Sequence, residues 1–152
     1  MTILDQIIKT KEIEINYSKC NTSIVELEKL PIFKRTTISL SDSIKNSFHG
    51  VIAEHKRKSP SKSIINDSIS LSQVIKGYNN AGVSGISVLT DNNYFQGSLE
   101  DLLNARKMTK IPVLRKEFII DEYQIIEAKA YGADAILLIA ACFFNKKIKS
   151  LS

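Results

Sequence analysis

Cysteine is scarce in this sequence, and its two copies, Cys20 and Cys142, lie far apart without a CxxC pattern. This spacing indicates neither a disulfide framework nor a zinc site and is typical of a reducing compartment. The longest apolar run, AILLIAACFF at 135–144, has ten residues and is too short to cross a bilayer. The first fifteen residues contain acids and no continuous apolar segment, unlike a signal peptide. We therefore expect a cytoplasmic protein that does not interact with a membrane.

A strong charge of one sign is also lacking. Twenty-one Lys and Arg against sixteen Asp and Glu give a net charge of +5, and the basic residues are dispersed. Without an RNA- or DNA-binding motif, this balance favours a mildly basic enzyme that handles phosphorylated metabolites over a nucleic-acid-binding protein. No glycine-rich dinucleotide fingerprint follows the first predicted strand, which disfavours a Rossmann domain.

Helices are predicted before the first strand. In the first of them, isoleucine and leucine residues fall near one helical face, and Thr2 with Asp5 resembles a capping box. The third is expected to be capped by Ser41. The predicted helices span residues 2–17, 23–30 and 42–47. We therefore expect residues 1–50 to form an N-terminal helical extension.

From residue 51 onward, apolar runs alternate with helical segments. The predicted strands lie near 51–56, 85–89, 112–116 and 135–139. Their starts are 34, 27 and 23 residues apart, which is typical of successive βα units. Such units form a parallel sheet with right-handed crossovers. The whole chain, 1–152, is thus predicted to be one α/β domain. Periodicity alone does not distinguish a barrel from an open doubly wound sheet.

Charged residues cluster where the predicted strands end, at the edge where parallel α/β folds build their active sites. Because side chains alternate along a strand, Glu54 and Lys56 share one face of the first strand. Lys116 shares a face of the third strand with Leu114 and Phe118. If both faces point inward, two lysines and a carboxylate converge, and they could neutralise an anionic substrate and deliver a proton. Surface charge or a structural ion pair is an equally good interpretation of the pattern alone.

Other charged and aromatic residues near the strand ends are expected to have structural or ligand-binding roles. His55 lies on the opposite face of its strand and is expected to pack against a helix. Phe95 and Phe118, in or beside βα loops, could form an aromatic wall for a flat ligand or could pack in the core. The remaining strand-end cations are expected to be solvated or ion-paired: Arg57, Lys58 and Arg115.

Three motifs in this sequence resemble the indole-3-glycerol-phosphate synthase family. IAEHKRKSPSK (52–62) is similar to its first-strand signature, and SVLTDNNYFQGSLEDL (87–102) to its second-strand segment. PVLRKEFIIDEYQIIEAKAYGADAILLIAA (112–141) resembles its third and fourth strands almost continuously. The Glu-x-Lys-x-x-Ser-Pro-Ser segment disfavours another phosphate-binding barrel, such as phosphoribosylanthranilate isomerase.

The resemblance implies a (β/α)8 TIM barrel and a role in tryptophan biosynthesis. The substrate would be 1-(2-carboxyphenylamino)-1-deoxyribulose 5-phosphate, converted to indole-3-glycerol phosphate, CO2 and water without a metal or organic cofactor. The family's general-acid lysine falls on Lys116. Lys56 matches a lysine that engages the anionic groups of the substrate, and Glu54 a glutamate that orients or charge-balances the lysines. The substrate-binding positions implied are Ser59, Pro60, Phe95, Phe118 and Leu137.

The chain departs from the family pattern in length. A complete barrel usually needs roughly 250 residues, and 152 residues accommodate about four βα units after the extension. The second carboxylate, an asparagine and the phosphate-binding loops of the family would lie in the other half. We therefore expect this chain alone to be inactive. The alternative is a noncatalytic half-barrel that self-associates or pairs with a separate C-terminal half.

Overall fold

A computed structural model describes residues 2–142. The chain begins with the helices α1 (Ile3–Asn21), α2 (Ile24–Lys29) and α3 (Leu40–Lys45). Thr2 and Asp5 form the predicted capping box, in which each side chain accepts a hydrogen bond from the backbone N–H of the other residue. The predicted cap of α3 was wrong. Ser39 caps this helix, because its Oγ accepts the N–H of Asp42 at 3.1 Å, and the helix begins at Leu40 instead of residue 42.

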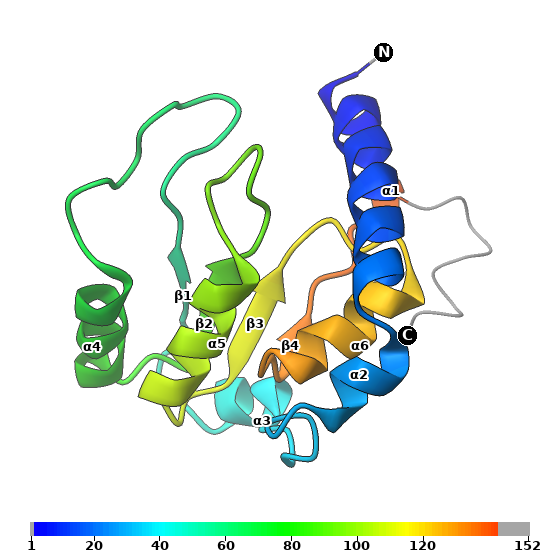
Figure 1. Ribbon diagram of the computed structural model, residues 1–152. Coiled ribbons are helices and arrows are strands. Elements are labelled where there is room, and N and C mark those ends of the chain that lie inside the picture. The colour runs from blue at the N-terminus through cyan, green and yellow to red at the C-terminus, as the bar shows by residue number, and fades with distance from the viewer. Residues whose placement is uncertain (1, 143–152) are drawn as a thin grey trace.

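The strands form one parallel sheet in the order β1-β2-β3-β4, which confirms the predicted succession of βα units (Figure 1). Their bounds are β1 Ile52–His55, β2 Gly85–Leu89, β3 Val113–Lys116 and β4 Ala135–Ile136. β4 is shorter than the predicted 135–139, because only its first two residues pair with β3. The repeat of βα units also predicts the start of a helix at NKKIKSLS (145–152), which lies outside the described residues.

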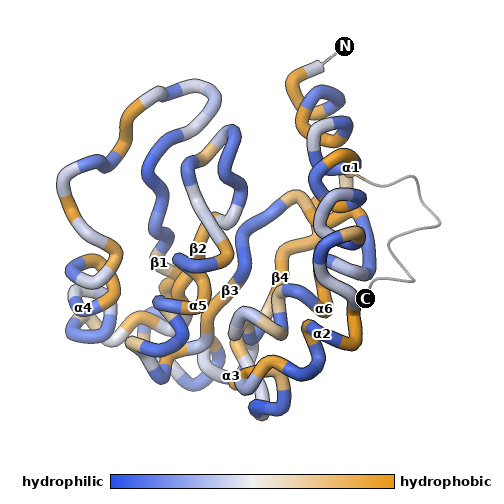
Figure 2. The backbone as a smooth tube through the Cα atoms, viewed as in Figure 1, coloured by the Kyte–Doolittle hydropathy of each residue, from blue (hydrophilic) through white to orange (hydrophobic). Residues whose placement is uncertain are grey.

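One face of the sheet is covered by the helices α4 (Leu71–Ala81), α5 (Leu99–Met108) and α6 (Glu122–Ala130) (Figure 1). Ile86 and Val88 of β2 are fully buried there, together with Ile75, Leu102 and Ala128 from the three helices. Figure 2 shows hydrophobic segments on β2 and β3 at the centre of the molecule. Burying each large aliphatic side chain contributes roughly 1.5–3 kcal/mol, so this layer fixes the orientation of the strands. No helix within residues 2–142 is long and apolar enough to span a membrane.

The N-terminal extension packs on the outside of α6. Ile15 of α1 and Leu27 of α2 form a second buried cluster with Tyr123 and Ala130. The Tyr123 hydroxyl donates to the carbonyl oxygen of Thr22, 2.9 Å away, so it remains hydrogen-bonded inside this cluster. The extension is therefore joined to the α/β part by a continuous apolar contact.

The buried carboxylate of Asp134 joins the segment after α2 to the sheet. This contact lies at the end of the sheet opposite the strand-end lysines. Asp134 has no exposed side-chain surface, and it accepts hydrogen bonds from Arg35 at 2.6 Å and Arg106 at 2.5 Å. It also accepts the backbone N–H groups of Ile38 and Val113, each at 2.8 Å. Four donors on one carboxylate compensate the cost of burying its charge.

Candidate active site

Glu54, Lys56 and Lys116 meet at the carboxyl ends of β1 and β3, an edge of the sheet that we call the mouth. The Glu54 carboxylate lies 2.9 Å from the Lys116 ammonium and 3.0 Å from the Lys56 ammonium. The hydroxyl of Ser87, the β2 residue paired with Glu54, donates to the same carboxylate at 3.2 Å. The predicted convergence of the three charged side chains is thus confirmed; their chemical roles stay predictions.

Glu54 is an ionised bridge between the two lysines. Burial raises the pKa of Glu54, but the hydrogen bonds from Lys116 and Lys56 outweigh this effect, so its pKa lies below the ordinary value. The three side chains keep 27–35% of their surface exposed. Because an ammonium group has three donors, each lysine has capacity left for an anionic or carbonyl ligand at the mouth.

An apolar cavity of about 130 Å³ adjoins the charged group. Its walls include Phe95 and Phe118, whose ring centroids are 6.1 Å apart, within the range of favourable aromatic pairs. Leu89 and Ile139 add aliphatic surface. A cavity of about 150 Å³ holds one benzene ring, so this space suits a single aromatic ring placed beside the lysines.

The loop between β2 and α5 carries Phe95 to this cavity along a tightly fixed path. Asp91 accepts the backbone N–H groups of Tyr94 at 2.6 Å and Phe95 at 3.2 Å. The loop then turns back, so that a Cβ atom on Gly97 would lie 2.0 Å from the carbonyl oxygen of Leu89. Only glycine fits there, which explains the glycine of the second motif.

Three of the predicted binding residues do not line the cavity. Ser59 and Pro60 belong to the long loop after β1, where Ser59 forms a tight turn with Lys62. Leu137 is half-buried, and Ile139 lines the cavity instead. Sequence reasoning missed Leu89 and Ile139. The alternation of strand side chains could have indicated Leu89, because it pairs with Lys116 and so lies on the same face of the sheet.

His55 lies on the face of the sheet opposite Glu54 and the two lysines. His55 is only 3% exposed, lies next to the core residue Val88 and packs toward α4, as predicted. Its Nε2 atom is buried without a hydrogen-bond partner. Burial and the positive charge of Arg57 lower the pKa of His55, and the negative charge of Asp101 partly opposes them.

The strand-end arginines are paired, in agreement with the sequence prediction. Arg57 binds Asp101 with two hydrogen bonds of 2.6 and 3.0 Å. Arg115 is buried and lies 2.9 Å from Glu127 of α6. Lys58 is half-buried in the loop after β1. Among residues 2–142 no three His, Cys, Asp or Glu side chains gather as a metal site would require.

Comparison with known proteins gives one consistent match. A family model described as "Indole-3-glycerol phosphate synthase" matches residues 4–152. A protein of that name from Bacteroides thetaiotaomicron is 41% identical over 99% of this chain, and one from Leptospira interrogans is 47% identical over 97%. One from Neisseria meningitidis serogroup B is 42% identical over 97%. The chain belongs to the indole-3-glycerol phosphate synthase family.

The match to the synthase family covers the three motifs and every residue at the mouth, since it extends over residues 4–152. The three relatives are longer proteins, and the chain spans 55–58% of their length. Within residues 2–142 the structure shows a parallel sheet of four strands with its helices. The mouth thus lies wholly within the part of the chain that resembles these longer relatives.

Proposed function

We propose that this chain carries the acid–base half of an indole-3-glycerol phosphate synthase active site. The reaction would be ring closure of 1-(2-carboxyphenylamino)-1-deoxyribulose 5-phosphate with loss of CO2 and water. The supporting observation is the contact of Lys116 and Lys56 with one carboxylate, beside a cavity walled by two phenylalanines. Family membership supports this choice of substrate and reaction.

Lys116 is proposed to be the general acid. The ring carbon that bears the substrate carboxylate attacks the ketone, and a C–C bond forms while the carbonyl oxygen takes a proton from Lys116. CO2 then leaves the ring carbon, and the electron pair of the broken C–C bond restores the aromatic ring. The new hydroxyl group takes a second proton and departs as water, while the adjacent CH2 carbon loses a proton and the indole double bond forms; Lys116 regains its proton from solvent. Glu54 holds the Lys116 ammonium at 2.9 Å and so aims it into the mouth. Glu54 acts here as a positioning residue.

Lys56 is proposed to bind the anionic groups of the substrate. Its ammonium lies on the other oxygen of Glu54, 3.0 Å away, and lines the same cavity as Lys116. Phe95 and Phe118 would hold the anthranilate ring, because the cavity has the size for one ring. Ser59, Pro60 and Leu137 remain proposed substrate contacts of the complete site. The chemistry uses protons and charge alone, and we propose no metal or organic cofactor.

The architecture proposed is a (β/α)8 barrel represented by about four βα units in residues 51–152, with residues 1–50 as the N-terminal extension. Phosphate capture in such barrels uses the loops after the last strands. The chain spans 55–58% of its relatives and on this proposal holds none of those loops. The phosphorylated substrate would thus be bound only when the second half is supplied.

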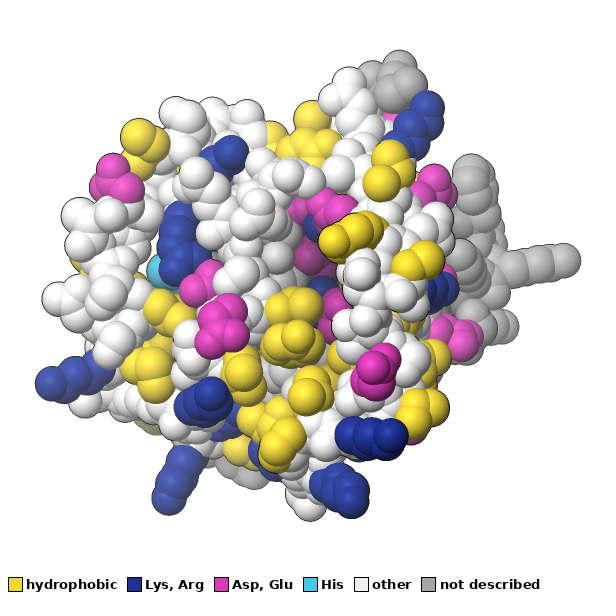
Figure 3. Space-filling view, in the orientation of Figure 1, with side chains coloured by type: hydrophobic (Ala, Val, Ile, Leu, Met, Phe, Trp, Pro, Cys, Tyr) yellow, Lys and Arg dark blue, Asp and Glu magenta, His cyan; other side chains and the backbone are white. Residues whose placement is uncertain are grey.

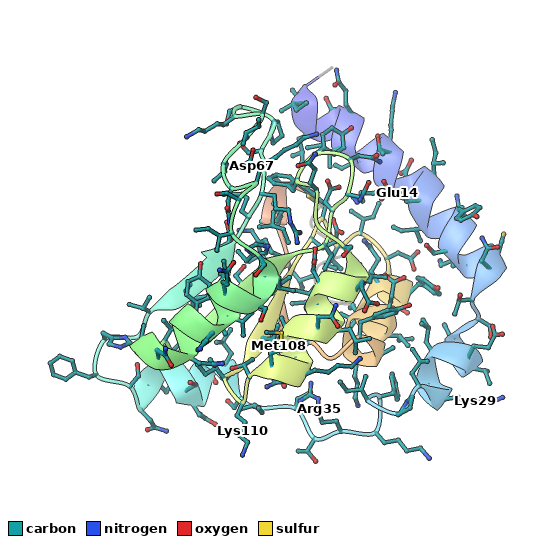
Figure 4. All side chains as sticks on the ribbon, turned by 60° about the vertical axis from the view of Figure 1, so that its left-hand side comes forward. Glu14, Lys29, Arg35, Asp67, Met108 and Lys110 are labelled. Atoms are coloured by element: carbon teal, nitrogen blue, oxygen red, sulfur yellow. The ribbon has the colours of Figure 1, made fainter. Side chains whose placement is uncertain are left out.

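A reconstitution assay tests the proposal. The purified chain, alone and mixed with a fragment carrying βα units five to eight of a relative, is assayed for indole-3-glycerol phosphate by its fluorescence. We expect turnover only in the mixture. Lys116→Met should then lower kcat by the ~10²–10⁴ typical of acid–base groups, and Lys56→Met should mainly raise KM. Lys110→Met, at an exposed lysine far from the mouth, is the matched control (Figure 4). Turnover by the chain alone, or by the Lys116→Met mixture at the control rate, would contradict the assignment.

A second candidate is a noncatalytic half-barrel that associates with itself or with a separate C-terminal half. It is supported by the outer edge of β1, because in the described part of the chain β1 pairs only with β2. Val51 and Ile52 at this edge are 45% and 40% exposed. Analytical ultracentrifugation combined with the fluorescence assay distinguishes the two candidates. A stable complex that shows no turnover, even with the second half present, supports the noncatalytic half-barrel.

A further inference from the structure

Lys11 lies on the buried face of α1, in a place that the proposed reaction does not use. It is 2% exposed and is flanked one turn away on either side by Ile7 and Ile15, which are 3% and 6% exposed. A buried ammonium is costly unless it is paired with opposite charge. Its position within an otherwise apolar stripe therefore requires a compensating contact outside the helix.

The compensating contacts come from the ends of two strands. The Lys11 ammonium lies 2.6 Å from Asp91, which follows β2, and 3.3 Å from Glu117, the residue after Lys116. Glu14 of the same helix is a third partner at 2.6 Å. Burial lowers the pKa of Lys11, but attraction by these carboxylates outweighs it, so the pKa lies above its ordinary value. Figure 3 shows charged side chains on the floor of the hollow between α1 and the β2–α5 loop.

Each of the two buried carboxylates also holds the backbone of one cavity phenylalanine. Asp91 accepts the N–H of Phe95 at 3.2 Å, and Glu117 accepts the N–H of Phe118 at 2.9 Å. One ammonium group therefore neutralises both acceptors that fix the aromatic pair. Removing it would leave Asp91, which is 1% exposed, without its cationic partner.

Two more contacts join the same side of α1 to the β2–α5 loop. The hydroxyl groups of Thr10 and Tyr94 are 3.0 Å apart, and Asn93 donates to Glu14 at 2.6 Å. In Figure 4, Glu14 lies between α1 and this loop. Residues 10, 11 and 14 thus form a continuous contact with the loop that carries Phe95.

We infer that Lys11 is a positioning residue, through which α1 holds Phe95 and Phe118 in place as the aromatic wall of the mouth. Any consequence for turnover rests on the proposed synthase function. The positioning itself does not, since it concerns the backbone of the free chain and can be measured without substrate.

Site-resolved amide hydrogen exchange of the chain tests the inference. In Lys11→Met, which keeps the length and apolar stem, the amides of Tyr94, Phe95 and Phe118 should exchange at least ~10-fold faster, because local opening no longer breaks an ion pair. The amide of Ile86, which bonds to Pro112 across β2 and β3, should keep its rate. Lys9→Met, at an exposed position of the same helix, should change none of them.

Two further variants separate positioning from loss of folding. Thr10→Val removes the contact with the Tyr94 hydroxyl, along with a bond inside α1 from Thr10 Oγ1 to the Gln6 carbonyl, and leaves the Lys11 ion pairs in place. It should accelerate exchange at Tyr94 and Phe95 by a smaller factor. Lys11→Arg keeps the charge and should restore most of the protection. Unchanged exchange at Phe95 and Phe118 in a folded Lys11→Met chain would overturn the inference. An equal acceleration at all amides would also overturn it; if Lys11→Met does not fold, unchanged rates in Thr10→Val would do so.

Discussion

Asp134→Asn tests how the N-terminal extension is attached to the sheet. The native carboxylate has no exposed surface and receives two guanidinium groups and two backbone N–H groups. Asparagine keeps the shape, but it removes the charge and turns an NH2 group toward donors. Arg106, whose side chain is 5% exposed, is left with a buried uncompensated charge. Arg35, at 23%, can reach water.

The expected loss follows from these exposures. Removing one partner of a buried ion pair costs about 3–5 kcal/mol, and the partial solvation of Arg35 places this case at the lower end. With a urea m-value of roughly 1–3 kcal/mol per M, the unfolding midpoint should fall by one to three M. Asp67→Asn, in the exposed loop after β1 at the other end of the sheet, is the matched control (Figure 4). Urea unfolding followed by circular dichroism measures both variants. A midpoint for Asp134→Asn equal to that of the control would refute the reasoning.

Two further predictions concern the site region. The pKa of His55 is lowered in the folded chain, so its contribution to stability is present above about pH 6.5 and is lost as the pH falls through the folded pKa. Urea midpoints of the native chain should therefore drop between pH 7 and pH 5 more steeply than those of His55→Leu. The control His49→Gln, at the exposed histidine, should behave like the native chain. Parallel curves of midpoint against pH for all three proteins would contradict this. Gly97→Ala places a Cβ atom 2.0 Å from the carbonyl oxygen of Leu89 and should lower the free energy of unfolding by about 1–3 kcal/mol. The control Gly77→Ala, with open space around it in α4, should be neutral or stabilising. Thermal unfolding of the two alanine variants decides the point, and equal melting temperatures would argue against the close approach.

The sequence was sufficient to predict the succession of four βα units and the meeting of Glu54, Lys56 and Lys116. Both follow from local regularities, the repeated βα spacing and the alternation of side chains along a strand. The cap of α3 also has a local signal, which was missed: Ser39 stands three residues before Asp42, the same spacing as Thr2 and Asp5. The structure adds a contact across 96 residues, because Asp134 accepts the N–H of Ile38, just before Ser39.

The role of Lys11 was missed because its partners are distant in the sequence. Its only local signal is its four-residue spacing between Ile7 and Ile15, on the face that the structure buries. That spacing predicts burial, but its partners Asp91 and Glu117 lie far along the chain, and nothing near Lys11 specifies them. Ile139 was missed because β4 ends at Ile136, so strand alternation no longer applies where the cavity is reached.

The long sequence separation of the extension contacts has a consequence for folding during synthesis. Each strand pairs with the one made just before it, so the sheet can grow as the chain emerges from the ribosome. The extension is synthesised before the sheet, but the residues that hold it there are synthesised late. Lys11 can pair with Glu117 only after that residue has emerged, and Arg35 pairs with Asp134, 99 residues further on. We therefore expect the extension, although it precedes the strands in the chain, to dock after β1, β2 and β3 have paired. Until residue 134 has emerged, the nascent extension is the part of this protein most open to proteases and chaperones.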